Sequence, residues 1–164
     1  MAAYEQYSDA IFRHCWFRIR DRQAALDLMQ ETFTKTWRHI TQQHGKVENL
    51  RAFLYTVANN LIIDRSRKKR ESSLEDLAES GFDPGQRDRR LDSDPLAADD
   101  VRRLLATINP KYREAVQLRF FDDLSPKEIA RVLDISENNA SVRIHHGLKQ
   151  LREQYKKLDQ AYGR

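Results

Sequence analysis

The sequence contains a single cysteine, Cys15, among its 164 residues. One cysteine excludes an intramolecular disulfide and a zinc site built from cysteines, and the five histidines share no metal-ligand spacing with an acid or with Cys15. The chain also lacks an apolar run long enough to span a membrane, and its first residues lack the basic segment and apolar core of a signal peptide. These absences predict a cytoplasmic protein that holds no metal or other cofactor.

Glycine and proline are also scarce, with five and four residues, whereas charged side chains make up 33% of the chain. Few chain breakers and abundant charge favour helices with much solvated surface. The net charge of +4 is unevenly distributed, because residues 71–100 carry ten acidic against three basic side chains. That segment has a balance of −7, so the rest of the chain carries +11. Two basic flanks around an acidic middle indicate polyanion binding at both ends.

The segment from Ser125 to Gln150 has the pattern of a helix-turn-helix. It opens with Ser125-Pro126-Lys127-Glu128, in which a capping serine, a proline in the first turn and a glutamate three residues after the cap form a helix-start signature. Asp134-Ile135-Ser136 interrupts the helix, and Ser136 is placed to cap a second one. The second helix has an apolar stripe and a polar, basic outer face, which fits the DNA major groove. An ordinary helical hairpin with a solvated face is the alternative for this segment alone.

The first 70 residues show three apolar stripes at helical spacing, which predict a three-helix bundle. The third stripe begins near Asn49 and runs into Arg65–Arg70, where five of six residues are basic. The segment from Thr41 to Glu48 has no such period and is predicted to be a loop. The stripe expected on the second helix consists of Leu26, Met29, Phe33, Trp37 and Ile40. Because aromatic residues in apolar stripes are usually buried, the expected core includes Trp16, Trp37 and Phe53.

Residues 71–94 combine low apolar content, a Gly/Pro turn and repulsion between acidic groups, which predicts a flexible acidic linker. A second helical set begins at residue 95, where Asn109-Pro110 is positioned to cap its second helix. The helix-turn-helix supplies the last two helices. The predicted architecture is all-α, with a three-helix domain in residues 1–70, the linker in 71–94 and a four-helix domain in 95–164.

Several motifs, taken in order, resemble bacterial RNA polymerase sigma factors. Asp27-Leu28-Met29-Gln30-Glu31-Thr32-Phe33, then Phe53–Leu61 and the basic run, are similar to sigma region 2. Asn109–Glu114, followed by Leu124–Ala130, is similar to region 4. With only these two regions and a short linker, the chain resembles the extracytoplasmic-function (ECF) subgroup.

The resemblance implies roles for two surfaces of the first domain. The polar face of the second helix is expected to dock on the coiled-coil clamp of the largest RNA polymerase subunit, through Asp27, Gln30, Glu31 and Lys35. The loop 41–48 is expected to capture a flipped base of the promoter −10 element, together with Asn60 and Asp64 on the following helix. The residues expected to hold backbone phosphates there are Arg65, Arg67, Lys68 and Arg70.

In the second domain, the resemblance implies that the recognition helix reads the −35 element. Ser141, Val142, His145 and His146 fall at the reading positions, with Arg143 close to the DNA backbone. Neighbours on a helix point about 100° apart, so at most one of the two histidines aims straight at a base while the other leans toward a phosphate. Relatives often have arginine where Ser141 and His146 stand, so the promoter sequence is not inherited from them. Many relatives also have glycine where this chain has Asp134, and aspartate adopts the left-handed conformation at some cost.

The prediction is therefore a dissociable polymerase subunit, not an enzyme, that recognises promoter DNA and helps to melt it. Its expected partners are core RNA polymerase and promoter DNA, and the acidic linker is expected to lie in a basic channel of the polymerase. An anti-sigma protein is a further candidate partner, and the sequence leaves open whether one restrains this chain. The alternative is a self-sufficient helix-turn-helix regulator that binds duplex DNA as a dimer. A nuclease is disfavoured, because the motifs assemble no carboxylate cluster, metal site or nucleophile–base pair.

Overall fold

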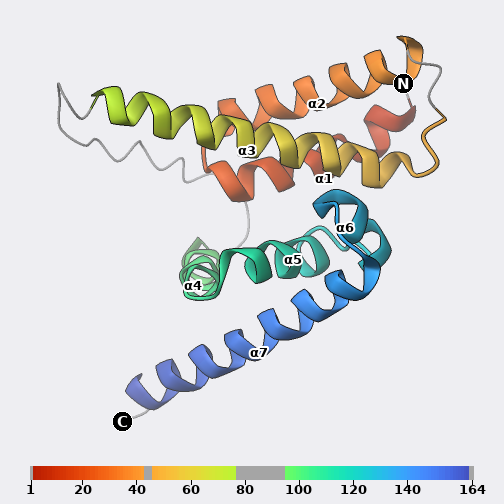
Figure 1. Cartoon of the computed structure of the whole chain (residues 1–164). Coiled ribbons are helices and arrows are strands. Elements are labelled where there is room, and N and C mark those ends of the chain that lie inside the picture. The colour runs from red at the N-terminus through yellow and green to blue at the C-terminus, as the bar shows by residue number, and fades with distance from the viewer. Residues whose placement is uncertain (1, 43–45, 77–94, 163–164) are drawn as a thin grey trace. The chain divides into compact units, whose positions relative to one another are not determined.

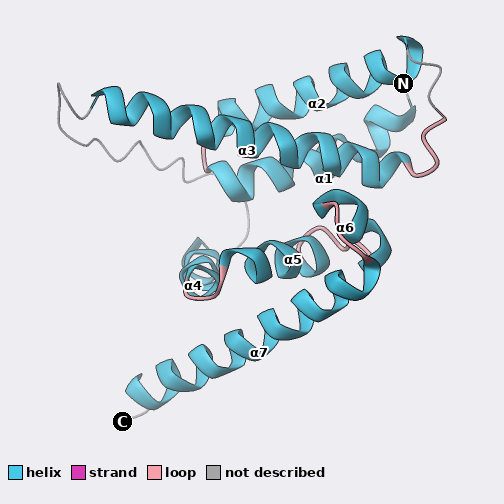
Figure 2. Ribbon diagram, viewed as in Figure 1, coloured by secondary structure: helices cyan, strands magenta, loops and turns pink. Residues whose placement is uncertain are grey.

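The computed structural model describes residues 2–42, 46–76 and 95–162, and all regular secondary structure in these ranges is α-helical (Figures 1 and 2). The chain divides into two compact units, residues 1–88 and 89–164. The helices of the first unit are α1 (Ala2–Ile19), α2 (Arg22–Gln42) and α3 (Leu50–Asp76). Those of the second are α4 (Pro95–Ala106), α5 (Pro110–Phe120), α6 (Pro126–Leu133) and α7 (Glu137–Tyr162). Across the described ranges, the all-α prediction with three and then four helices is confirmed.

Two helices extend beyond their predicted ends. α2 continues to Gln42, so the first two residues of the loop predicted at 41–48 are helical, and residues 43–45 lie outside the described part. α3 continues to Asp76, six residues into the predicted linker. The extension is explained by the sequence after residue 50, in which no glycine or proline occurs before Gly81. The remaining linker residues, 77–94, with the acidic groups Asp83, Asp88, Asp92 and Asp94, also lie outside the described ranges.

In the first unit, α1, α2 and α3 all pack against one another. α1 contributes Ile11 and Cys15 to the core, and both side chains are fully buried. α3 contributes Leu54, Tyr55 and Ala58, which are also almost completely buried. Burial of each large apolar side chain stabilises the fold by about 1.5–3 kcal/mol, which makes it the main stabilising contribution in this core.

The predicted core face of α2 is wrong by a rotation of about 100°, or one residue along the helix. Of the predicted stripe only Met29 is buried, at 5% exposed, and Trp37 is 68% exposed. Trp16 and Phe53, also expected in the core, are half-buried. The residues of α2 that face the core are Ala24, Ala25, Leu28, Met29, Thr32 and Thr36. Small side chains allow close helix contact, and the buried Thr32 hydroxyl is satisfied because it donates to the Leu28 carbonyl at 2.7 Å.

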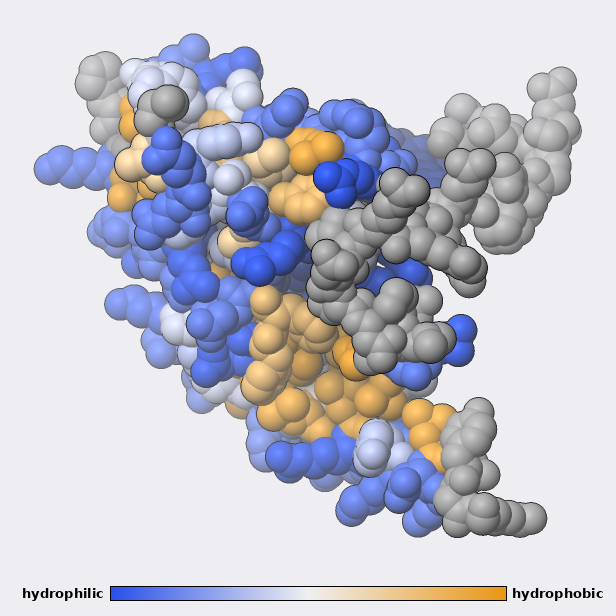
Figure 3. All heavy atoms as spheres, turned by 180° about the vertical axis from the view of Figure 1, so that it is seen from behind, coloured by the Kyte–Doolittle hydropathy of each residue, from blue (hydrophilic) through white to orange (hydrophobic). Residues whose placement is uncertain are grey.

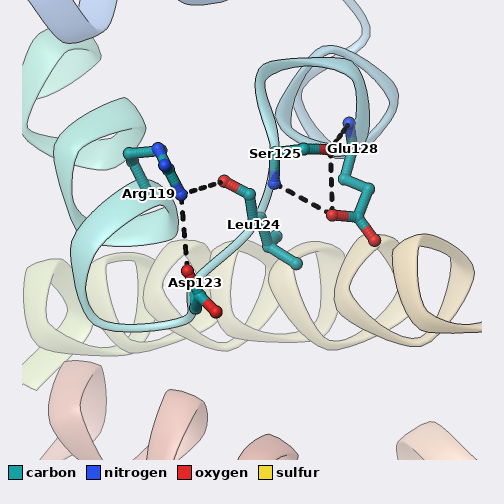
Figure 4. A network of polar contacts seen from close by, with 5 residues as sticks. All are labelled: Arg119, Asp123, Leu124, Ser125 and Glu128. Carbon is teal, nitrogen blue, oxygen red and sulfur yellow. Dashed lines mark hydrogen bonds and ion pairs between the residues drawn. The ribbon is translucent and has the colours of Figure 1, made fainter.

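The second unit carries the predicted helix-turn-helix, and its local signals are confirmed. The Ser125 hydroxyl accepts from the Glu128 amide at 3.3 Å, and the Glu128 carboxylate accepts from the Ser125 amide at 2.9 Å, as Figure 4 shows. The same figure shows Arg119, which donates to Asp123 and to the Leu124 carbonyl and so holds the turn before α6. Asp134 ends α6 with φ 52° and ψ 52°, the left-handed conformation that its position requires.

α5 and α7 approach closely at Gly147, which is buried. A Cβ atom on Gly147 would lie 2.4 Å from Val116 Cγ2 and 3.1 Å from the Tyr112 carbonyl oxygen. Near the same crossing, the Gln150 side chain accepts a hydrogen bond from the Asn109 amide at 3.1 Å. The start of α5 is therefore fixed beside the middle of α7.

We expect Gly147→Ala to lower the free energy of unfolding of the second unit by about 1–2 kcal/mol. Alanine favours the helix by about 1 kcal/mol, but its methyl group overlaps a stiff valine side chain. Urea unfolding followed by circular dichroism measures the difference, with Ser141→Ala on the exposed side of α7 as control. Val116→Ala removes the overlapping methyl, so Gly147→Ala should cost less in that background. An equal cost in both backgrounds would contradict the packing explanation.

The rotation of α2 gives a second stability prediction. Trp37→Ala should cost less than about 1 kcal/mol, whereas truncation of a buried aromatic side chain costs about 3–5 kcal/mol. Leu28→Ala, which removes a side chain that is 5% exposed, should cost about 2–5 kcal/mol. The same unfolding measurement compares the two variants. A larger cost for Trp37→Ala than for Leu28→Ala would mean that the observed face of α2 is wrong.

Candidate functional site

The four residues predicted to dock on a partner all lie exposed on α2. The Glu31 carboxylate and the Lys35 ammonium group are 3.1 Å apart and each side chain is 49% exposed. One turn earlier, the Gln23 amide donates to Asp27 at 3.0 Å. Gln30 is exposed between these pairs. The structure therefore brings Asp27, Gln30, Glu31 and Lys35 onto one polar, solvent-facing side of the helix.

Trp37 adds an apolar group to this side of α2, which the sequence analysis missed. It lies seven residues from Gln30, so the two side chains leave the helix in nearly the same direction. Beside Trp37 is an open hollow of about 550 Å³ between the start of α1 and the second half of α2. Tyr4 and Phe33 line it with their ring centroids 4.9 Å apart. Large apolar residues at helical spacing do not by themselves reveal whether they face a core or solvent.

On α3, Asn60 and Asp64 are both exposed and four residues apart. Asp64 is 3.6 Å from Arg67, which is also 4.0 Å from Glu71. At about 100° per residue, Arg67 and Lys68 share the side of Asn60 and Asp64, whereas Arg65 and Arg70 lie on its two flanks. The predicted base-capturing pair thus lies on one edge with two of the four predicted phosphate contacts. The loop residues 43–45, expected to complete that pocket, are outside the described ranges.

On α7, the predicted reading residues lie on the solvent side of the helix. Ser141, His145 and His146 are exposed, and Val142 is an apolar residue that is 43% exposed. Arg143 is half-buried and its Nε donates to Asn139 at 3.3 Å. The Ser136 hydroxyl accepts from the Asn139 amide at 3.1 Å, as the predicted cap requires. The structure therefore brings the reading residues together on the outer face of a firmly capped helix.

Contacts between α5 and α7 involve one of the residues predicted to read DNA, a feature that the sequence did not indicate. The His146 ring stacks on Tyr112 of α5, with ring centroids 5.5 Å apart and an interplanar angle of 28°. Lys111 Nζ lies 5.0 Å from the centroid of the same Tyr112 ring. The edge of the predicted reading face is therefore shared by two helices.

The second unit also exposes apolar side chains along the C-terminal half of α7. Tyr155 is 62% exposed and Leu158 is 44% exposed, while Val101 of α4 is 41% exposed. Figure 3, viewed from behind, shows apolar side chains gathered above this part of α7. Exposed apolar groups that cluster in this way are typical of protein contact surfaces.

Within the described ranges, no group of three or more metal-binding side chains occurs. None of the described helices is long and apolar enough to cross a membrane.

Comparison with known families matches both units. Residues 3–72 match the model of Sigma-70 region 2, and residues 98–151 match that of Sigma-70, region 4. The ECF RNA polymerase sigma factor BldN of Streptomyces coelicolor is 35% identical over 140 residues, which cover 82% of this chain and 52% of that protein. The chain thus spans about half the length of BldN. The ECF RNA polymerase sigma factor SigW of Bacillus subtilis is 27% identical over 162 residues, covering 93% of this chain and 86% of SigW.

Solved structures show the same fold. The sigma factor RpoE from Bartonella quintana, in a co-crystal with the anti-sigma factor NepR, matches with a TM-score of 0.72 and 20% identity. That match covers 94% of this chain and 95% of RpoE. CnrH, solved in complex with the cytosolic domain of CnrY, matches with a TM-score of 0.69 and 18% identity over 95% of this chain and 86% of CnrH. Since both sigma regions occur in order and curated relatives of this type match most of the chain, it belongs to the ECF subgroup of bacterial RNA polymerase sigma factors.

Proposed function

We propose that the chain binds core RNA polymerase and directs promoter-specific transcription initiation, reading the −35 element as duplex and capturing a base of the −10 element. The observation that carries this proposal is the pair of exposed polar edges on the first unit, one on α2 and one on α3. A self-sufficient regulator binds duplex DNA through its helix-turn-helix alone and has no use for either edge. A subunit that joins a polymerase to opened DNA needs both.

The α2 edge suits a protein partner. Its charges come as an exposed pair, Glu31 and Lys35, which contributes only about 0.3–0.5 kcal/mol to the helix and is exchanged at small cost. Trp37 supplies an aromatic group on the same side, and exposed aromatic residues often carry much of the binding energy of an interface. The expected partner surface is the coiled-coil clamp of the polymerase.

The α3 edge suits an unstacked base. The Asn60 side chain has two donors and an acceptor, which match the hydrogen-bonding edge of a base, and it is exposed. Taking a base out of the duplex costs a few kcal/mol, which such contacts must offset. Lys68 lies on the same side of the helix, within reach of a strand held there. Phosphate contacts of this kind give affinity without sequence information.

The outer face of α7 suits a DNA major groove. A groove about 12 Å wide admits one α-helix, and Ser141, Val142 and His145 occupy its exposed side. Val142 has no hydrogen-bonding group, so its expected preference is for a thymine methyl group.

An anti-sigma protein is proposed as a second protein partner. Two structural relatives, RpoE and CnrH, were solved with the anti-sigma factor NepR and the cytosolic domain of CnrY. In this chain, Tyr155 and Leu158 offer exposed apolar surface on α7 that such a partner would cover. Co-purification of the tagged chain from its own cells tests whether one is present.

The polymerase proposal is tested by charge changes on α2. Glu31→Lys and Lys35→Glu should each weaken binding to core RNA polymerase by roughly tenfold, because each reverses a charge at the interface. The double variant Glu31→Lys with Lys35→Glu keeps the ion pair within the helix but exchanges its ends. It should keep the parent's stability and still bind polymerase weakly. Titration of labelled chain with core enzyme measures the affinity.

Lys156→Glu, a charge reversal on α7 of the second unit, serves as the control for altered net charge and should leave the α2 contact intact. Parental affinity in all three α2 variants would rule out docking through this face. No binding of the parent chain to core enzyme would instead favour the self-sufficient regulator.

The −10 proposal is tested by Asn60→Ala in the holoenzyme. Its partner exists only after a base leaves the stack, so open-complex formation should fall by roughly tenfold while initial duplex binding is unchanged. Permanganate reactivity of promoter thymines measures opening, and gel shift at low temperature measures initial binding. Ser66→Ala, an exposed change on the same helix, is the control. Equal loss of both steps would assign Asn60 to duplex binding.

A further inference from the structure

Two adjacent histidines on α7 are exposed, but the structure gives them different neighbours. His146 lies flat against Tyr112, with centroids 5.5 Å apart and planes 28° apart. His145 contacts only the edge of His146 among the ring contacts described, at 5.9 Å and 69°. Offset stacking of aromatic rings is favourable by about 0.5–1.5 kcal/mol. The stacking therefore holds the His146 ring on the side of α7 that faces α5.

The position of Tyr112 beside His146 is fixed by the helix crossing itself. Gly147 lies next to His146 and leaves no room for a Cβ, because the Tyr112 carbonyl and the Val116 side chain are too close. The Asn109 amide donates to the Gln150 side chain at 3.1 Å, one turn further along α7. Two contacts thus locate the first turn of α5 against α7, so Tyr112 and Lys111 keep their places when the surface meets a ligand.

A helix that enters the major groove fills it. The groove is about 12 Å wide, and an α-helix with its side chains is about 10–12 Å across. A second helix packed against the first therefore lies over the groove wall, which is the phosphate backbone. Lys111 is carried by α5 and is exposed, so with α7 in the groove we expect its ammonium group to meet phosphate oxygens and not base edges.

His146 lies at the same boundary. Since one face of its ring packs on Tyr112, the ring nitrogens of His146 lie at the edge of an exposed ring beside α5. A phosphate oxygen at this ring edge could accept a hydrogen bond from a ring N–H of His146. His145 leaves the helix about 100° away from His146, and none of the ring contacts described joins it to α5. Of the pair, only His145 is not stacked on a ring of α5 among the contacts described.

We infer that Lys111, Tyr112 and His146 form a phosphate-binding edge beside the recognition helix, and that His145 is the histidine that reads a base. Tyr112 acts as a positioning residue that holds the His146 ring. This inference rests on the proposed binding of duplex DNA by the second unit, and it specifies which contacts give affinity and which give sequence preference.

The test uses the full chain bound to core RNA polymerase. The parent complex first selects its preferred sequence from a randomised duplex library. Affinities are then measured, at low and high salt, for the selected duplex and for every single base-pair change in it. The variants are Lys111→Ala, His145→Ala, His146→Ala, Tyr112→Phe and Tyr112→Ala, with thermal unfolding to verify that each chain is folded.

His146→Ala should weaken binding by roughly fivefold for every duplex alike, because one phosphate hydrogen bond is lost. Lys111→Ala should do the same and lower the salt slope by up to about one. Tyr112→Ala should resemble His146→Ala and add little to it in the double variant, whereas Tyr112→Phe keeps the ring and should bind like the parent. His145→Ala should instead remove the preference at one or two base pairs.

Lys157→Ala is the matched control for the loss of a positive charge in Lys111→Ala. Lys157 lies about 16 Å further along α7 than His146, away from the proposed phosphate-binding edge. Its effect should be smaller than that of Lys111→Ala. The inference is overturned if His146→Ala changes which base is preferred, or if His145→Ala weakens all duplexes equally. If the parent complex selects no sequence at all, the proposed function itself fails, and the inference fails with it.

Discussion

The second unit depends on the close approach of α5 and α7 at Gly147. A side chain there would overlap Val116 and press on the Tyr112 carbonyl, so only the absence of a Cβ permits this crossing. The hydrogen bond between Asn109 and Gln150 then fixes the start of α5 along α7. Because the crossing lies directly beside exposed positions of α7, the contact that closes the core also sets which side chains border the proposed DNA-reading face. A change at Gly147 would therefore disturb both the stability of this unit and the face proposed to read DNA.

In the first unit, the corresponding constraint is the use of small residues where α2 meets its neighbours. Ala24, Ala25, Thr32 and Thr36 are buried, and the threonine hydroxyl at position 32 is satisfied within its own helix. Close packing of this side turns Trp37 outward, onto the side of α2 that also carries Gln30. The core of this unit and its proposed docking face are thus two consequences of one helix rotation.

The features that the sequence predicted well are those that depend on a few adjacent residues. The capping box of Ser125 and Glu128 and the left-handed Asp134 are local, and both are present. The face of α2 was mispredicted because size and hydrophobicity suggested a core for Trp37, whereas helix packing selected alanine and threonine. The contact of His146 with Tyr112 joins residues 34 positions apart and depends on the crossing geometry, which helix periodicity does not contain. The exposure of the predicted site residues follows from periodicity, but their partners do not.

The ion pairs within α2 and α3 reduce the free charge on the two polar edges of the first unit. On α3, Arg67 lies near both Asp64 and Glu71, so the edge beside Asn60 is less positive than the run Arg65–Arg70 suggests. These pairs are exposed, and such pairs contribute about 0–1 kcal/mol at most. A phosphate can therefore displace the carboxylates from Arg67 at small cost, while the pairs keep the side chains near the helix before DNA arrives. In the same way, charged groups of a protein partner can replace the exposed ion pair between Glu31 and Lys35 on α2 at small cost. Both proposed surfaces of the first unit thus carry charges whose internal pairing is weak enough to be replaced by an external one.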